Sequence, residues 1–119
     1  RLISFFPVEE QAVVRGRLAQ NLMAVVSLRL LAGCNGFGRL PGVEVMLVTR
    51  SIEECIRNPE KTSEIQTYIQ RATEIGMQTF DQHLADLVGQ GTVTYEVAHA
   101  AASRPSDFAL TVRTFSETR

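Results

Sequence analysis

The sequence has few of the residues on which most recognisable sites depend. It contains no Trp, two His and two Cys in 119 residues. Cys34 and Cys55 are isolated and form no C-x-x-C pair, which argues against a zinc ribbon or a disulfide framework and favours a reduced, cytoplasmic setting. No apolar run reaches the roughly 18 residues of a membrane-spanning helix, and no signal peptide is visible.

Strong charge of either sign is also missing. The formal net charge is −1, which gives no reason to expect nucleic acid or an anionic membrane as a partner. The few aromatic residues are not interleaved with basic ones, and no helix has a polar face rich in Lys and Arg, so we expect no direct membrane insertion. His83 and His99 lack convergent ligands, and we expect both on exposed helix surfaces.

A nucleotide-binding loop is absent as well. The string G-x-x-x-x-G-K-[ST], whose backbone amides and Lys hold phosphates, does not occur. Residues 36–41 begin like G-x-G-x-x-G but lack the last glycine. Because Asn35-Gly36 is a turn signal, we interpret this stretch as a hairpin loop and expect no cofactor bound by this chain.

Hydrophobic periodicity predicts a helix, a hairpin and then more helices. A helix begins near Pro7 and gives way to alternating apolar residues over 23–31, which pair with 40–48 as an antiparallel hairpin. Before it, the apolar run from Leu2 to Phe6 is typical of the end of a buried helix. The chain opens within this run and without Met, so we expect it to be cut from a longer protein.

Capping pairs in the second half predict short helices. Ser51 with Glu54 predicts a helix over residues 51–58, and Ser63 with Gln66 predicts another whose apolar face ends at Ile75. Thr94 is expected to cap a helix ending near residue 102, and the tail is expected to be helical.

The most specific local signal lies at residues 76–82. Gly76 can adopt the positive φ that ends a helix, and Thr79 with Gln82 forms a capping box that starts the next. The segment therefore predicts a corner between two helices, with a structural role. Its residues are Gly76, Met77, Gln78, Thr79, Phe80, Asp81 and Gln82.

These residues resemble the C-terminal part of the PilT-type ATPases of type IV pilus retraction, or twitching motility, in the secretion ATPase superfamily. Residues 76–82 carry the most specific likeness. The run L-M-A-V-V-S-L-R-L-L at residues 22–31 is similar to the family's L-x-x-V-I-S-Q-x-L-L, and residues 38–49 are similar to its G-R-x-A-x-x-E-x-L-x-x-T. The matching tail comprises Tyr95, Glu96, Ala98, Ala102, Ser103, Asp107 and Phe108.

The resemblance implies an α+β fragment of an α/β RecA-like ATPase, with an antiparallel β-hairpin followed by a helical bundle. Residues 1–50 would supply the last helix and strands of the RecA-like domain, and residues 51–119 a C-terminal helical module. The parent protein would use ATP and Mg, assemble as a hexamer on the cytoplasmic face of the inner membrane, and act on an inner-membrane pilus platform protein. The family's nucleotide-handling motifs lie upstream, so we expect no catalytic, cofactor-binding or metal-binding residue here and no ATP hydrolysis by this chain alone.

One family motif needed for retraction, A-I-R-N-L-I-R-E, corresponds to residues 51–58. Ile52, Ile56 and Arg57 match it, and Ser51 and Cys55 are mild changes. We expect these five residues to form the partner surface, and an Ile56→Asp variant to lose retraction while keeping its fold. The other positions of this segment differ from the family motif, so the parent protein could instead be a paralogous or accessory motor.

Two other interpretations stay open. The chain could be a free-standing helical module that binds a partner protein, which a start codon near residue 1 would favour. It could also belong to a pilus assembly or type II secretion ATPase. Those relatives often carry a four-cysteine metal element, and the two isolated cysteines speak against it.

Overall fold

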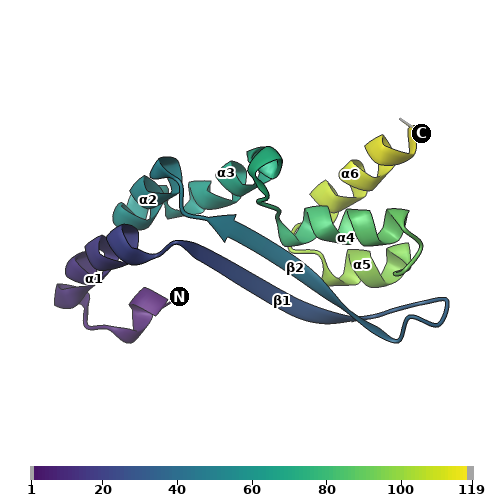
Figure 1. Ribbon diagram of the computed structural model, residues 1–119, viewed down its shortest axis with the longest axis horizontal. Coiled ribbons are helices and arrows are strands. Elements are labelled where there is room, and N and C mark those ends of the chain that lie inside the picture. Colours follow the sequence, from purple (N-terminus) through teal and green to yellow (C-terminus); the bar gives the residue numbers. More distant parts are fainter. Residues whose placement is uncertain (1, 118–119) are drawn as a thin grey trace. The chain divides into compact units, whose positions relative to one another are not determined.

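The computed structural model describes residues 2–117, with side chains described as far as Arg113, and contains a two-stranded antiparallel sheet and a set of short helices (Figure 1). No helix within residues 2–117 combines the length and apolar character needed to cross a membrane. The α-helices are α1 (Val8–Asn21), α2 (Arg50–Arg57), α3 (Ile65–Arg71), α4 (Phe80–Gly89), α5 (Tyr95–Ala101) and α6 (Pro105–Glu117). The strands are β1 (Ala24–Ala32) and β2 (Arg39–Leu47), and 3-10 helices span Leu2–Phe5, Pro59–Glu64 and Thr73–Ile75.

The chain folds into two compact units, each with its own core. The first takes residues up to Val25 together with Met46–Met77, and the second takes Val26–Val45 together with residues from Gln78 onward. The division crosses the hairpin instead of falling near residue 50. The predicted boundary at residue 50 concerns the domains of a longer protein and stays a prediction.

The β-hairpin confirms the strand pairing predicted from the alternation of apolar residues. Asn35 and Gly36 both have positive φ, +54° and +83°, the backbone conformation for which Asn-Gly pairs are favoured in hairpin turns. The tip of the hairpin is fastened to the loop between α4 and α5. The Cys34 amide donates to the Thr92 carbonyl at 2.8 Å, and Asn35 Nδ2 donates to the Gly91 carbonyl at 3.0 Å.

The core of the first unit joins α1, α2 and α3. Leu18 of α1 and Leu22, its C-cap, lie four residues apart and so fall on one side of this helix. Both side chains pack against a cluster of buried residues from all three helices and the segment after them. This cluster comprises Ala19, Ile52, Ile56, Ile69 and Met77.

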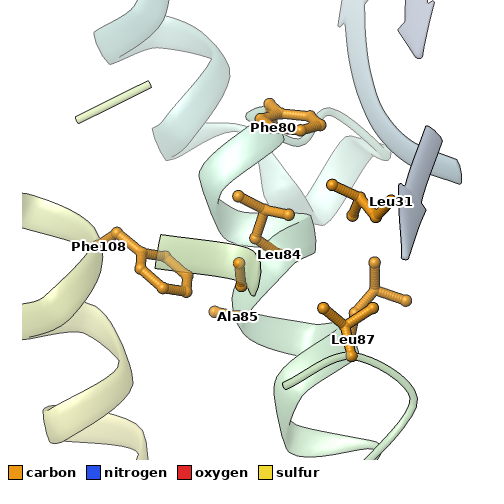
Figure 2. Close-up of a cluster of buried hydrophobic side chains, with 8 residues drawn as sticks. Leu31, Phe80, Leu84, Ala85, Leu87 and Phe108 are labelled. Atoms are coloured by element: carbon orange, nitrogen blue, oxygen red, sulfur yellow. The ribbon is translucent and has the colours of Figure 1, made fainter. Parts of the chain in front are cut away.

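The core of the second unit lies around α4. Leu84 is fully buried, and Phe80 and Leu87 lie on the same side of the helix, which presents them to β1 and to α6 (Figure 2). This is the apolar face that the i, i+4, i+7 spacing predicts. The cluster comprises Leu31, Phe80, Leu84, Ala85, Leu87, Val93, Ala98 and Phe108.

Three local predictions were wrong. The apolar run at the start forms a 3-10 helix, Leu2–Phe5, whose Leu2 and Phe5 are exposed instead of buried. The helix expected from Ser63 begins at Ile65, after a 3-10 turn, and Glu64 precedes it without a side-chain cap. Because α3 ends at Arg71, Ile75 falls outside its periodicity and is exposed.

Candidate functional site

The helix predicted as the partner surface is present as α2, but it begins differently from the prediction. Thr49 caps it: the Ile52 amide donates to Thr49 Oγ1 at 3.4 Å. The predicted cap, Ser51, already lies inside the helix. Two overlapping signals compete here, and the earlier hydroxyl caps the helix. The end of the helix is as predicted, because Asn58 is its C-cap and Pro59 follows.

The apolar side of α2 is buried in the first unit. Ile52 and Cys55 are 0% and 1% exposed, and Ile56 is 8% exposed. Three of the five predicted partner residues therefore face the core and are not available to a partner. For the same reason, the expectation that Ile56→Asp keeps its fold was wrong, since that change would place an unpaired carboxylate in an apolar cluster.

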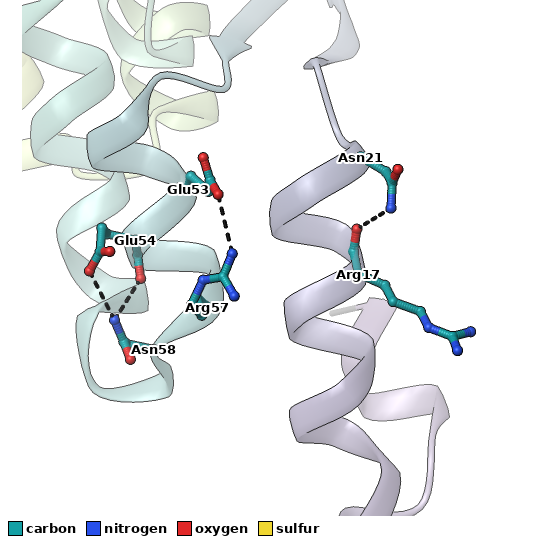
Figure 3. A network of polar contacts seen from close by, with 6 residues as sticks. All are labelled: Arg17, Asn21, Glu53, Glu54, Arg57 and Asn58. Carbon is teal, nitrogen blue, oxygen red and sulfur yellow. Dashed lines mark hydrogen bonds and ion pairs between the residues drawn. The ribbon is translucent and has the colours of Figure 1, made fainter.

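The opposite side of α2 is open to solvent. Ser51, Glu54 and Arg57 are exposed, together with Arg50 at the first position. Arg57 forms an ion pair with Glu53 at 3.2 Å, and Asn58 Nδ2 donates to the Glu54 carbonyl at 3.0 Å (Figure 3). The surface that α2 can offer is therefore polar and carries charges of both signs.

The C-terminal end of α2 is held by residues of the same unit. Arg15 on α1 donates from Nη1 to the Ile56 carbonyl at 3.4 Å and lies 3.5 Å from Thr62 Oγ1. Thr62 Oγ1 in turn donates to the Cys55 carbonyl at 3.4 Å. A guanidinium at this position also complements the negative end of the helix dipole. These contacts, 7 to 47 residues apart in the chain, fix how α2 is presented.

Cys55 is a buried hydrophobe rather than a reactive thiol. Burial raises the pKa of its thiol above the ordinary 9.0, and the nearby carboxylate of Glu64 adds to the rise. A raised pKa disfavours the thiolate, which is the nucleophilic form. The surroundings of Cys55 therefore disfavour thiol chemistry at this helix.

The second predicted segment, residues 76–82, has a clear geometry. Gly76 adopts φ +96°, as predicted, although it ends the 3-10 helix Thr73–Ile75 and not an α-helix. Met77 is 2% exposed and belongs to the core of the first unit. From Gln78 onward the segment belongs to the second unit.

Gln78 lies along β2. Its backbone exchanges two hydrogen bonds with Val45, at 2.9 and 3.1 Å, and its side chain donates to the Val43 carbonyl at 2.7 Å. The next contact continues this line, because the Phe80 amide donates to Glu44 Oε1 at 3.2 Å. The segment thus lies beside β2 and fastens the hairpin to the start of α4.

The predicted capping box at the start of α4 is confirmed. The Gln82 amide donates to Thr79 Oγ1 at 3.1 Å, and the Thr79 amide donates to Gln82 Oε1 at 2.9 Å. Asp81, one residue before Gln82, accepts hydrogen bonds from the amides of Ser103 and Arg104 at 2.8 and 2.9 Å, just before α6. The polar side chains of the segment are therefore engaged in structure.

Sequence reasoning missed the contacts of both histidines. His83 is partly buried, and its Nδ1 accepts a hydrogen bond from the Val43 amide at 2.8 Å. His99 lies among the rings of Tyr95 and Phe108, with centroids 5.6 and 6.4 Å away. No local pattern marks a contact such as that of His83, whose partner lies 40 residues earlier.

Among the side chains that the structure describes, as far as Arg113, no group of three or more His, Cys, Asp or Glu residues could hold a metal ion. The glycine-containing stretch at 36–41 forms the end of the hairpin loop and the start of β2, as predicted, and not a strand-to-helix turn.

Several known proteins are similar to this chain in sequence. The type IV pilus ATPase PilU of Pseudomonas aeruginosa is 40% identical over 117 residues, which is 98% of this chain and 30% of PilU. The type IV pilus retraction ATPase PilT of the same organism is 36% identical over 91% of this chain and 31% of PilT. A twitching motility protein of Neisseria gonorrhoeae is 35% identical over 86% of the chain and 27% of its own length. The search against models of protein families found no match.

A solved structure agrees with these relatives. The crystal structure of the pilus retraction motor PilT with bound ADP superposes with a TM-score of 0.70 at 31% identity, over 90% of this chain and 29% of that one. The chain is homologous to a segment of the PilT-type pilus ATPases. The predicted fold class, an α+β segment of a RecA-like ATPase, is thereby confirmed. The ATPase DotB of Yersinia pseudotuberculosis, at 18% identity and TM-score 0.65, shares the fold.

The homology covers a limited part of these proteins. The chain spans about a third of the length of PilU and PilT. The resemblance to the PilT-type ATPases found in the sequence is confirmed over nearly the whole chain. The ATPases themselves are about three times as long as this chain.

Proposed function

We propose that this chain is part of a motor ATPase that drives type IV pilus retraction and twitching motility. The observation that carries this proposal is the agreement of sequence and structure: 40% identity to PilU over 98% of the chain, and a TM-score of 0.70 to the retraction motor PilT. In this proposal, parts of the protein outside residues 1–119 bind ATP and Mg. The chain itself contributes scaffold and a contact surface.

The exposed side of α2 is the surface that we assign to the partner. It coincides with the segment that resembles the family's retraction motif, and the buried side of the same helix anchors it through Ile52 and Ile56. Arg15 holds the end of the helix from α1. Ser51 and Arg57 are the two predicted partner residues that remain exposed, and they carry the proposed contact.

The remaining family properties follow as parts of the same proposal. The protein would work as a hexamer in the cytoplasm, at the inner membrane, with the pilus platform protein as its partner.

The ion pair between Arg57 and Glu53 is solvent-exposed and therefore contributes at most about 1 kcal/mol to folding. Its charges are thus free to exchange their partner within the helix for one on another protein.

A paralogous or accessory motor is the second candidate. The helix at 51–58 departs from the family motif at Glu53, Glu54 and Asn58. Because the segment differs from the motif at these three positions, we keep a motor that works beside the principal retraction ATPase as the alternative proposal.

The direct test is deletion of the full reading frame in the source organism. We expect loss of twitching with pili still on the cell surface, because fibres that form would no longer be withdrawn. Restoration by the wild-type gene is the control. A deletion strain that still twitches but retracts against load poorly supports the accessory motor. A strain without pili would point to an assembly ATPase, and a strain with unchanged twitching and retraction would overturn both proposals.

A further inference from the structure

The backbone of Val43 is bound by two side chains from the helical part of the second unit. His83 on α4 accepts from the Val43 amide at 2.8 Å, and Gln78 donates to the Val43 carbonyl at 2.7 Å. Both contacts are partly buried. A single residue of β2 is therefore held by one acceptor and one donor, and the acceptor is an imidazole ring, which can take up a proton.

The acceptor role defines the state of the imidazole. A ring nitrogen that accepts from an N–H carries no proton, so the proton of neutral His83 is on Nε2. In the imidazolium both ring nitrogens are donors. Protonation would therefore place the Nδ1 proton against the Val43 amide proton and remove the bond.

Charged groups of both signs surround this contact. Glu44 follows Val43 on β2, and its carboxylate accepts from the Phe80 amide. Arg29 of β1 lies over the Phe80 ring, 4.9 Å from its centroid. On α4, Asp86 is one turn from His83, while the Asp81 carboxylate is occupied by amides before α6. With charges of both signs nearby, the direction of the change still follows from the contact alone, because only the neutral ring can accept from the Val43 amide.

We propose that His83 is a pH-sensitive latch between β2 and α4, closed when the imidazole is neutral and opened by its protonation. The opening is local to Val43. The backbone bonds between Val45 and Gln78 contain no titrating group, and they keep the strand beside the segment that precedes α4.

The test measures amide hydrogen exchange of Val43 and Val45 by NMR, with 15N-labelled Val and His, in the protein expressed from its full reading frame. The Val43 protection factor should fall by about threefold to tenfold between about pH 8 and about pH 5, which is the effect of one hydrogen bond. The Val45 protection factor should stay constant. The 15N spectrum of His83 at the higher pH should show the Nε2–H tautomer.

A matched variant separates the latch from general acid loosening. In His83→Asn the side-chain Oδ1 occupies the place of Nδ1 and can still accept from Val43 but does not titrate, so Val43 protection should become independent of pH. In His83→Ala protection should be low at both pH values. The proposal is overturned if Val43 protection does not change with pH in the wild type, if it changes equally in His83→Asn, or if Val45 loses protection to the same extent.

Discussion

The Phe80 ring fills the space that a side chain at position 42 would need. A Cβ at Gly42 would lie 2.5 Å from Phe80 Cε2 and 3.2 Å from Leu31 Cδ1. Phe80 is also held by its neighbours, since it is 6% exposed and its amide donates to Glu44. The absence of a side chain at Gly42 therefore lets α4 lie against the hairpin.

Gly42→Ala is expected to destabilise the protein by about 1 to 3 kcal/mol, the range for overpacking a filled core. The physical reason is that the buried ring cannot move without opening the cluster around Leu84. Urea unfolding followed by circular dichroism measures the change. An unfolding free energy equal to that of the wild type would show that the ring is not confined.

Gly16→Ala is the opposite case and serves as the matched comparison. Gly16 lies within α1, and a Cβ there would meet nothing within 4 Å. Because Ala costs less backbone entropy in a helix, this variant should gain about 0.5 to 1 kcal/mol in the same urea experiment. A loss of stability would mean that α1 is not a regular helix at this position.

Thr79→Ala is expected to cost about 1 kcal/mol of unfolding free energy, because it removes the side-chain half of the capping box. Thr79→Ser keeps the hydroxyl and should lose clearly less. Thermal unfolding of the two variants under identical conditions makes the comparison. Equal losses would show that packing of the Thr79 methyl group, and not the cap, stabilises the start of α4.

Features that depend on residues close together in the sequence could be predicted, and contacts between distant residues could not. Thr79 with Gln82 and Asn35 with Gly36 are local signals, and both elements formed as predicted. Local signals fail where two overlap, as when Thr49 caps α2 in place of Ser51. The fold class was likewise predictable, whereas the contact role of residues 51–58 stays a prediction.

Contacts between distant residues could not be predicted. The partners of His83 and Gln78 lie 40 and 35 residues away on β2, and nothing in either local sequence marks them. The periodicity of residues 51–58 gives the helix one apolar side, but only the structure shows that this side, with Ile56, fills the core and cannot contact a partner. A residue cannot both fill a core and present itself to a partner.

The two cysteines should differ in reactivity and in its pH dependence. Cys55 is 1% exposed and burial raises its thiol pKa, whereas Cys34 is partly exposed. Iodoacetamide labelling followed by peptide mass spectrometry should modify Cys34 first in the native protein, and both equally in denaturant. Faster native labelling of Cys55 would contradict the buried position of its side of α2.

The raised pKa of the Cys55 thiol also predicts how the stability of the protein changes with pH. The folded state keeps the Cys55 proton to higher pH than the unfolded chain does, so stability falls as pH rises from the unfolded pKa towards the folded one. The wild type should therefore lose unfolding free energy above about pH 9, beyond the loss in Cys55→Ala, where no thiol titrates. Parallel pH profiles would show that Cys55 is not responsible.

The most direct test of the central claim is twitching motility in a strain whose full-length gene carries Arg57→Glu. The change reverses an exposed charge on α2 and breaks an exposed ion pair, so it should alter stability by at most about 1 kcal/mol. Arg71→Glu makes the same reversal at an exposed position on α3 and is the control. The account predicts that Arg57→Glu abolishes twitching while the protein accumulates normally, and that Arg71→Glu twitches like the wild type. Normal twitching with Arg57→Glu, or an equal loss with both variants, would contradict it.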